Sequence, residues 1–399
     1  MAITTPTAPA ITKKNQGGRW DRFSSDRTLF VIGILVLAFV YPFIDKALGI
    51  NRIGSLEAML VFVILAMGLN IVVGYAGLLD LGYAAFFAIG AYTMAFLTSP
   101  SSYFIQKGWI PEFMQNFWPA MAVSWCVAAI FGVILGAPTL RLRGDYLAIV
   151  TLGFGEIVPN FFLNADTITG GTQGLNLIGK PRTFHLPFGY DLSFGPTDQR
   201  HWYWLMLLVV LVSLFLSLRF KESRLGRSWI AVREDEIAAS SMGVNLVRTK
   251  LWAFAMGASF AGFAGSVYAS AFQYVHPDQF LFSVSVMVLA MVILGGLGNV
   301  YGVIIGAVLI GGFDRILAEE LNGPVQWLGR TIGFDGLANH DVGTDRFLVF
   351  GLALVIMMLV RPEGLVPSRR RRRELHREDP DADQGIYAGQ IEHQPEALS

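Results

Sequence analysis

Four polar side chains lie within apolar stretches of this 399-residue chain. Asn70 and Asp80 fall in a glycine-rich segment, and Thr151 and Glu156 fall in a second apolar run. A carboxylate in an apolar run of membrane length is costly, and it usually pairs with another group or borders the path of a polar solute. We therefore predict that these four side chains line a solute path. The alternative is that they hydrogen-bond to backbone or polar groups, and the spacing leaves both open.

Catalytic chemistry has little support in the sequence. A single cysteine excludes a disulfide framework and a cysteine-based zinc site, and the six histidines show no metal-ligand spacing. Residues 174–180 match the first seven positions of a P-loop, but Pro181 stands where Ser or Thr should hold magnesium. We therefore expect no metal, no cofactor and no ATP hydrolysis by this chain. Thirty basic and thirty acidic residues give no charge bias toward nucleic acid.

The composition is typical of a membrane protein. Hydrophobic residues make up 53% of the chain and charged residues only 15%, whereas soluble domains carry roughly 25% charged residues. A transmembrane helix needs about 20 mostly apolar residues. We therefore predict an all-α polytopic bundle of about ten transmembrane helices. The predicted spans are 29–44, 55–73, 78–97, 118–137, 145–163, 202–218, 251–272, 281–298, 300–318 and 346–360.

The basic residues orient this bundle. Most of them lie in the N-terminal tail (1–28), the gaps 138–144 and 219–250, and the C-terminal tail (362–399). All four segments fall on one side of ten spans, and Lys and Arg collect on the cytoplasmic side of membranes. We therefore predict that both termini are cytoplasmic and flank one transmembrane domain at 29–361. The composition of both tails is typical of disorder.

Glycines predict how the helices pack. Gly298, Gly302 and Gly306 recur every four residues, which places them on one face of a helix. Small residues let transmembrane backbones approach closely, so we expect these glycines to pack against another helix. The alternative is that such close-packed helices rock against one another around a solute path.

The longest internal cytoplasmic segment is the gap 219–250. Residues 226–243 predict a short helix, with Gly243 as its C-terminal cap. Docking on a partner protein and lying on the membrane surface are both compatible with its periodicity. The apolar residues that need a partner surface are Trp229, Ile230, Ile237 and Met242.

This segment carries a recognisable motif. Glu236, Ala238, Ala239 and Gly243 resemble a variant of the E-A-A-x-x-x-G coupling motif of ABC importer permeases. One extra residue separates the glutamate from the alanine pair. The resemblance implies that the stretch from Arg233 to Gly243 couples the chain to an ATPase.

Longer stretches resemble one group within that superfamily. Residues 68–92, 141–174 and 226–306, with the block 291–298, are similar to the high-affinity branched-chain amino acid permeases, specifically their longer, second permease subunit. Urea and short-amide permeases share much of this pattern and remain the alternative for the substrate. An ATP-independent channel or secondary transporter is the alternative of another class, and it leaves the cytoplasmic helix unexplained.

The resemblance implies a set of partners. The chain would be one permease subunit of an ATP-driven importer in the bacterial inner membrane, moving branched-chain amino acids by alternating access. It would pair with a homologous second permease subunit within the membrane lipid. Two cytoplasmic ATPase subunits would bind the ATP, and a periplasmic solute-binding protein would deliver the solute. Rocking between two states requires that nucleotide or loaded binding protein stabilise each state differently.

Overall fold

The computed structural model describes most of the chain. The described residues are 38–47, 49, 52–139, 142, 144–186, 190–195, 198–332, 343, 346–361 and 364–366. Residues 1–53 and 54–399 form two compact units. In the first unit, residues 38–47 are helical, which overlaps the end of the predicted span 29–44. The predicted tails lie outside the described residues, apart from 364–366.

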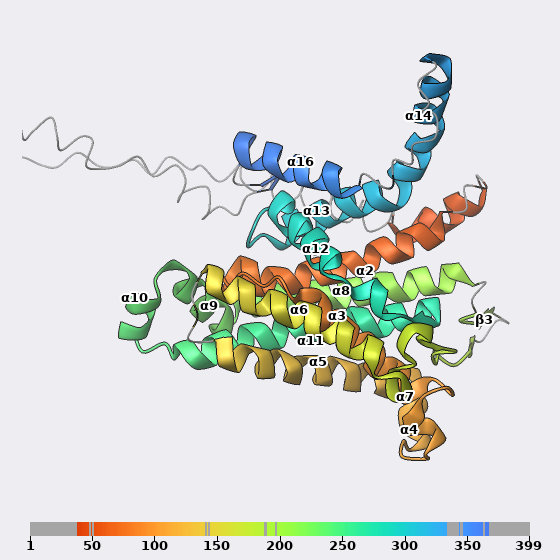
Figure 1. Ribbon diagram of the computed structural model, residues 1–399, viewed down its shortest axis with the longest axis horizontal. Helices are drawn as coiled ribbons and strands as arrows, with labels where there is room; N and C mark the ends of the chain where they lie inside the picture. Colours follow the sequence, from red (N-terminus) through yellow and green to blue (C-terminus); the bar gives the residue numbers. More distant parts are fainter. Residues whose placement is uncertain are drawn as a thin grey trace, which may run out of the picture. The chain divides into compact units, whose positions relative to one another are not determined.

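Helices dominate the second unit (Figure 1). Its first half contains α2 (Ile53–Leu69), the π-helix η1 (Asn70–Tyr75), α3 (Tyr83–Thr98), α4 (Tyr103–Gln106), η2 (Glu112–Gln115), α5 (Phe117–Thr139), α6 (Asp145–Asn164), α7 (Asp166–Thr169) and η3 (Gly171–Gln173). Its second half contains α8 (Gln199–Glu222), α9 (Arg224–Glu234), α10 (Glu236–Ser241), α11 (Leu246–Phe272), η4 (Pro277–Phe280), α12 (Phe282–Gly295), α13 (Val300–Gly312), the π-helix η5 (Phe313–Leu317), α14 (Ala318–Ile332) and α16 (Arg346–Val360).

The strands are short and form two antiparallel pairs. They are β1 (Leu175–Asn176), β2 (Phe184–Leu186), β3 (Tyr190–Leu192) and β4 (Tyr274–Val275). β1 pairs with β4, with Leu175 opposite Val275. β2 pairs with β3, with His185 opposite Asp191. The β1–β4 pair connects the loop after α6 to the end of α11. Because all the strands are this short, the helices determine the fold class.

Six helical segments of the described chain are long and apolar enough to cross a bilayer. They are Ile53–Tyr75, Phe117–Thr139, Asp145–Asn164, Gln199–Glu222, Leu246–Phe272 and Pro277–Gly295. The predicted class, an all-α membrane protein, is therefore confirmed. A total of ten spans and the cytoplasmic position of both termini stay predictions.

Two segments differ from the sequence prediction. The predicted span 78–97 starts too early, because α3 begins only at Tyr83 and residues 76–82 are not helical. Gly77 has φ +70°, a left-handed conformation that ends the preceding helix. The predicted outer gap 319–345 contains the amphipathic helix α14, which pure hydropathy scanning overlooks because polar residues alternate with its apolar ones.

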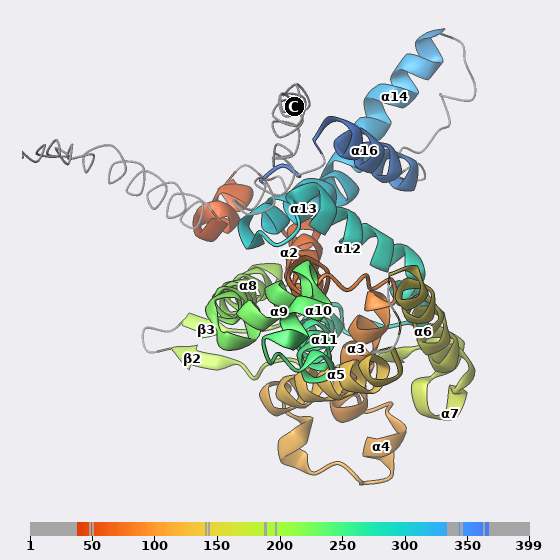
Figure 2. The ribbon, with the colours of Figure 1, turned by 90° about the vertical axis from the view of Figure 1, so that its left-hand side faces the viewer.

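The core of the second unit is built around η1 and two long helices. The segment formed by α2 and η1 is almost wholly buried, and α11 is buried along most of its length and packs against α3 and α5. By contrast, more than half of the membrane-length apolar stretch of α5, of α6 and of α8 is not buried by the rest of the chain. Figure 2 views this arrangement from the end that carries α9 and α10. Contacts of this kind require small residues, and Gly90 of α3 lies directly on Gly262 of α11.

The break between α12 and α13 is closed by a distant part of the chain. The last carbonyls of a helix lack partners within it and need donors from elsewhere. Leu365 and Val366 donate their backbone N–H groups to the carbonyls of Leu294 and Gly295, at 2.9 and 3.1 Å. The Asn299 Nδ2 group in turn donates to the Val366 carbonyl at 2.9 Å. We call residues 364–366 the C-terminal clip.

The three spaced glycines do not share one helix face. Gly302 and Gly306 lie in α13 against α12. A Cβ on Gly302 would come 2.3 Å from the Gly295 carbonyl oxygen, and a Cβ on Gly306 would come 2.2 Å from the Met291 carbonyl oxygen. Gly298 lies outside the helix, in the α12–α13 break, with φ +79°. The regular spacing therefore gave the wrong position for Gly298, because a turn interrupts the repeat.

Replacing Gly306 with alanine is expected to destabilise the α12–α13 contact. The added Cβ meets backbone, which cannot move aside as a flexible side chain can, and overpacking of this kind costs about 1–3 kcal/mol. The measurement is the midpoint of thermal unfolding in detergent. Gly312→Ala is the matched control, because a Cβ at Gly312, also in α13, has no atom within 4 Å. Equal midpoints for the two variants would contradict the prediction.

Candidate functional site

Asn70 connects two interrupted helices. It is the first residue of η1 and is fully buried. Its Oδ1 atom accepts a hydrogen bond of 2.9 Å from the backbone N–H of Gly298. Because Gly298 lies in the α12–α13 break, its N–H has no helical partner, and a buried N–H without an acceptor is costly. Asn70 therefore stabilises the broken segment by supplying that acceptor.

Arg233 reaches the same place from the cytoplasmic segment predicted by the sequence. Its guanidinium donates a hydrogen bond of 2.6 Å to the carbonyl oxygen of Gly74, in the last turn of η1. Its stem crosses Gly77, where a Cβ would lie 2.7 Å from the Arg233 Cγ. A cation at a helix C-terminus also interacts favourably with the helix dipole. We call Asn70, Gly74, Gly77, Arg233 and Gly298 the Arg233 junction.

The segment 226–243 forms two helices rather than the single predicted one. α9 ends at Glu234 and α10 begins at Glu236, with Asp235 in an extended conformation between them. The Asp235 carboxylate accepts the N–H groups of Ile237 and Ala238 at 2.7 and 3.0 Å. An aspartate that caps a helix N-terminus favours a break at its own position. That capping residue is the signal that the sequence reading missed.

Several contacts anchor this helical pair to the bundle. Trp229 is fully buried and donates its indole N–H to the Thr249 carbonyl of α11 at 2.9 Å. Lys250, also in α11 and buried, forms an ion pair of 2.6 Å with Glu236. Glu236 keeps 25% of its side chain exposed, so the pair is partly buried, and removing Glu236 leaves the buried Lys250 charge without this partner. Glu236 therefore serves within the chain, at the base of α10.

The end of α10 has the geometry that the sequence predicted for it. Gly243 has φ +83° and donates its N–H to the Ser240 carbonyl, while Val244 donates to the Ala239 carbonyl. These two bonds form a Schellman motif, which requires a left-handed residue at the Gly243 position. The glycine thus terminates α10.

The two alanines of the motif face opposite ways. Ala239 is only 5% exposed and packs inside the chain, whereas Ala238 is exposed. The large apolar residues exposed on the same short helix and its cap are Ile237 (71%) and Met242 (85%). Among the four apolar residues predicted to need a partner surface, Trp229 finds it within this chain. Ile237 and Met242 remain uncovered by the described residues.

Asp80 and Thr151 hold the non-helical segment that precedes α3. Thr151 Oγ1 accepts the Leu81 N–H at 3.0 Å, and Asp80 Oδ1 accepts the Gly82 N–H at 2.9 Å. Both side chains are fully buried. Like Asn70, they hydrogen-bond to backbone groups where a helix is interrupted, which is the alternative that the sequence left open.

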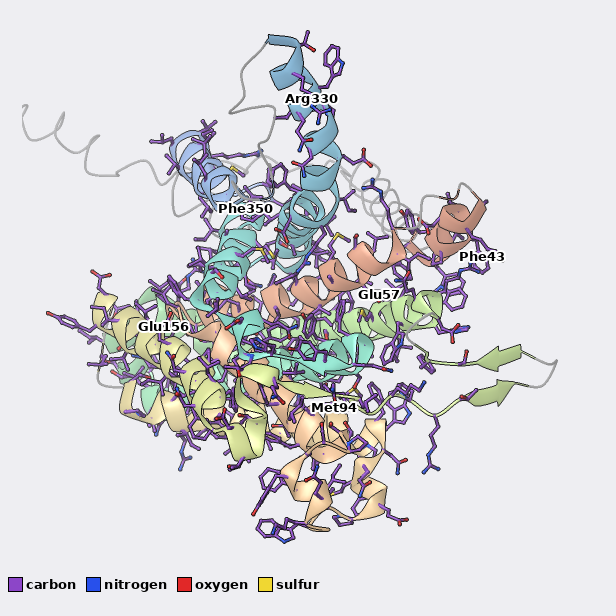
Figure 3. The ribbon with its side chains drawn as sticks, turned by 45° about the vertical axis from the view of Figure 1, so that its right-hand side comes forward. Phe43, Glu57, Met94, Glu156, Arg330 and Phe350 are labelled. Carbon is purple, nitrogen blue, oxygen red and sulfur yellow. The ribbon has the colours of Figure 1, made fainter. Side chains whose placement is uncertain are left out.

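Glu156 differs from the other three pathway candidates because it is exposed. It projects from the middle of α6 at the edge of the bundle (Figure 3). Together with neighbouring residues of the same helix it lines a shallow hollow that is open to the outside. The lining residues are Glu156, Ile157, Asn160, Phe161, Asn164 and Ala165. Of the four predicted residues, Asp80 and Thr151 thus meet at residues 81–82, whereas Glu156 is exposed on the surface of α6.

These features define the class of the protein. It is a multi-pass helical membrane protein with interrupted helices in its core and a short helical pair projecting from one end, as expected of a transport subunit. Within the described residues, no group of three or more His, Cys, Asp or Glu could hold a metal ion. The model of the family described as branched-chain amino acid transport system / permease component matches residues 51–330, and the chain belongs to this family.

Individual relatives agree with this assignment. The chain is 40% identical over 357 residues to the high-affinity branched-chain amino acid transport system permease protein LivM of Escherichia coli (strain K12), covering 86% of this chain and 75% of that protein. It is 22% identical over 314 residues to LivH, a permease protein of the high-affinity branched-chain amino acid transport system of the same strain (76% and 91%). No solved structure matches the chain. The resemblance predicted from the sequence is therefore confirmed, and the family is one of transport permeases rather than enzymes.

Proposed function

We propose that this chain is a permease subunit of an ATP-driven importer that moves branched-chain amino acids across the bacterial inner membrane. The family match over residues 51–330 carries the proposal, because it includes the buried core, the Arg233 junction and the pair α9–α10. The importer works by alternating access. Two cytoplasmic ATPase subunits bind and hydrolyse the ATP, and a periplasmic solute-binding protein delivers the amino acid.

A second permease subunit completes the pore. In Escherichia coli two different proteins similar to this chain carry the name of permease proteins of the high-affinity branched-chain system. This supports pairing with a homologous chain rather than with a second copy. The exposed face of α6 supports the position of the path, because a carboxylate halfway along a membrane-length helix is costly against lipid. We place this face toward the second subunit and the solute.

The pair α9–α10 docks on an ATPase. Figure 1 shows α10 at the far end of the long helices, beyond the end of α11, and its exposed Ile237 and Met242 are the apolar contacts it offers. This position supports docking on a cytoplasmic protein over lying on the membrane surface. Movement of the docked helix reaches the core through the Arg233 junction.

Other helices face lipid. On α5, exposed apolar residues follow one another along the helix without a polar residue between them, as lipid contact requires. They include Ile130, Phe131, Val133 and Ile134.

Uptake of labelled leucine tests the proposed function. Cells that lack this chain are expected to lose high-affinity leucine uptake and to regain it when the chain is restored together with the ATPase subunits. Excess isoleucine should compete, and excess urea should not. Competition by urea alone would support the amide-permease alternative. Leucine flux in proteoliposomes containing this chain and a second permease but no ATPase would support a channel or secondary transporter and contradict the proposal.

A further inference from the structure

The exposed face of α6 carries a row of hydrogen-bond acceptors. Glu156, Asn160 and Asn164 are all exposed and are spaced four residues apart, which places them on one helix face about 6 Å apart along the axis. Asn164 is the last residue of α6, next to α7, and Glu156 is near the helix centre. The row therefore runs from one end of a membrane-length helix to its middle.

Both asparagines are held in a fixed orientation. The Nδ2 group of Asn160 donates to the Glu156 carbonyl at 2.8 Å, and that of Asn164 donates to the Asn160 carbonyl at 2.7 Å. A backbone carbonyl can only accept, so the nitrogen of each amide is the atom turned to the helix. The Oδ1 oxygen of each is then the amide atom available to accept a hydrogen bond from a solute.

The row lies within the hollow on α6, which also has an apolar part. Ile157 and Phe161 are exposed beside the acceptors, at 66% and 59%. Glu156 is the one ionisable residue in the lining of this hollow. The hollow thus combines one carboxylate, amide oxygens and aliphatic or aromatic surface. A solute that matches all three has a cationic N–H group and a hydrocarbon side chain.

We propose that the hollow on α6 is a binding subsite for the amino acid in transit, with Glu156 as the acceptor for its α-ammonium group. Asn164 and Asn160 present oxygens to that group on the way to Glu156, and Ile157 and Phe161 contact the aliphatic side chain. The proposal rests on the proposed function, in which this face of α6 borders the solute path. Urea has no ionic group, so it gains no charge-assisted hydrogen bond here.

Charged thiol reagents test the subsite in the complete transporter. Cys126 is replaced with alanine, and Asn160→Cys provides a thiol one helical turn from Glu156. The rates of modification by a trimethylammonium-bearing and by a sulfonate-bearing methanethiosulfonate are compared. A nearby carboxylate raises the local concentration of cations, so we expect the cationic reagent to be favoured by roughly tenfold or more. Glu156→Gln should abolish this preference, and 1 mM leucine should slow modification only while Glu156 is present.

A matched charge-neutralising variant controls for effects of distant charges. Glu222 is an exposed carboxylate at the end of α8, and Glu222→Gln should leave the reagent preference unchanged. If neither reagent modifies the thiol at position 160, the face is closed to water and the proposed path fails. If both reagents react but Glu156→Gln changes neither the preference nor the protection by leucine, the path stands and the subsite is overturned.

Discussion

Replacing Arg233 with methionine is expected to lower the ratio of leucine transported to ATP hydrolysed by roughly 5- to 150-fold while the ATPase subunits stay bound. Couplings between distant sites are typically of this size. Methionine keeps much of the length of the stem over Gly77 but cannot donate to the Gly74 carbonyl, which Arg233 contacts at 2.6 Å. The link between α9 and the last turn of η1 is then lost. The measurement is the number of leucine molecules transported per ATP hydrolysed in proteoliposomes.

Two variants keep this prediction specific. Arg233→Lys retains one charged donor but not the planar fork, and we expect partial recovery of the transport ratio. Arg227→Met is the matched control, because Arg227 is also in α9 but is exposed, and its guanidinium donates to the nearby Glu222 carbonyl at 2.8 Å. A purely structural role for Arg233 would instead lower the yield and the unfolding temperature of the complex. An unchanged ratio in Arg233→Met would contradict the coupling role.

The double replacement Ile237→Asp and Met242→Asp is expected to release the ATPase subunits from the purified complex. These two apolar side chains are the most exposed ones on α10 and its cap. Interface anchors of this kind typically contribute 2 kcal/mol or more each, so the affinity should fall by on the order of 100-fold or more. Burying two carboxylates in an apolar interface adds a desolvation cost. Co-purification of the ATPase subunits with the membrane chain measures the effect.

The control for this prediction lies at the other end of the bundle. Phe113 in η2, before the start of α5, is exposed to a similar degree, and Phe113→Asp should leave ATPase association intact. Ala239 is unsuitable for this purpose despite its place in the motif, because it is buried and a larger residue there would displace α10 itself. Retention of the ATPase by the double variant would show that α10 is not the docking element.

Six of the predicted spans coincide with long apolar helices of the described chain, because lipid imposes a simple requirement. A helix that crosses a bilayer must be apolar over a fixed length, and that property can be read residue by residue. Interruptions were harder to predict. The late start of α3 depends on Gly77 and on an acceptor from Thr151, which is 70 residues away from Leu81. Pairings of this range leave no local periodicity.

The contacts of the candidate site residues could not be predicted from the sequence. The motif directed attention to the segment from Arg233 to Gly243, whose coupling role stays a prediction, and it did not reveal that Glu236 pairs with Lys250 or that Ala239 faces inward. The four polar residues in apolar runs looked equivalent in sequence. Three of them hydrogen-bond to backbone at helix breaks, and only Glu156 reaches the surface, because α6 has an uncovered face that no pattern in a single chain can indicate.

The break between α12 and α13 is completed only after the C-terminal clip has been synthesised. The hydrogen bond between Asn299 and Val366 joins residues 67 positions apart, so α12 and α13 leave the ribosome well before their break is completed. Until then the carbonyls of Leu294 and Gly295 lack the donors that Leu365 and Val366 supply. A ribosome that stops short of residue 364 therefore releases a chain in which the end of α12 lacks both of these hydrogen bonds.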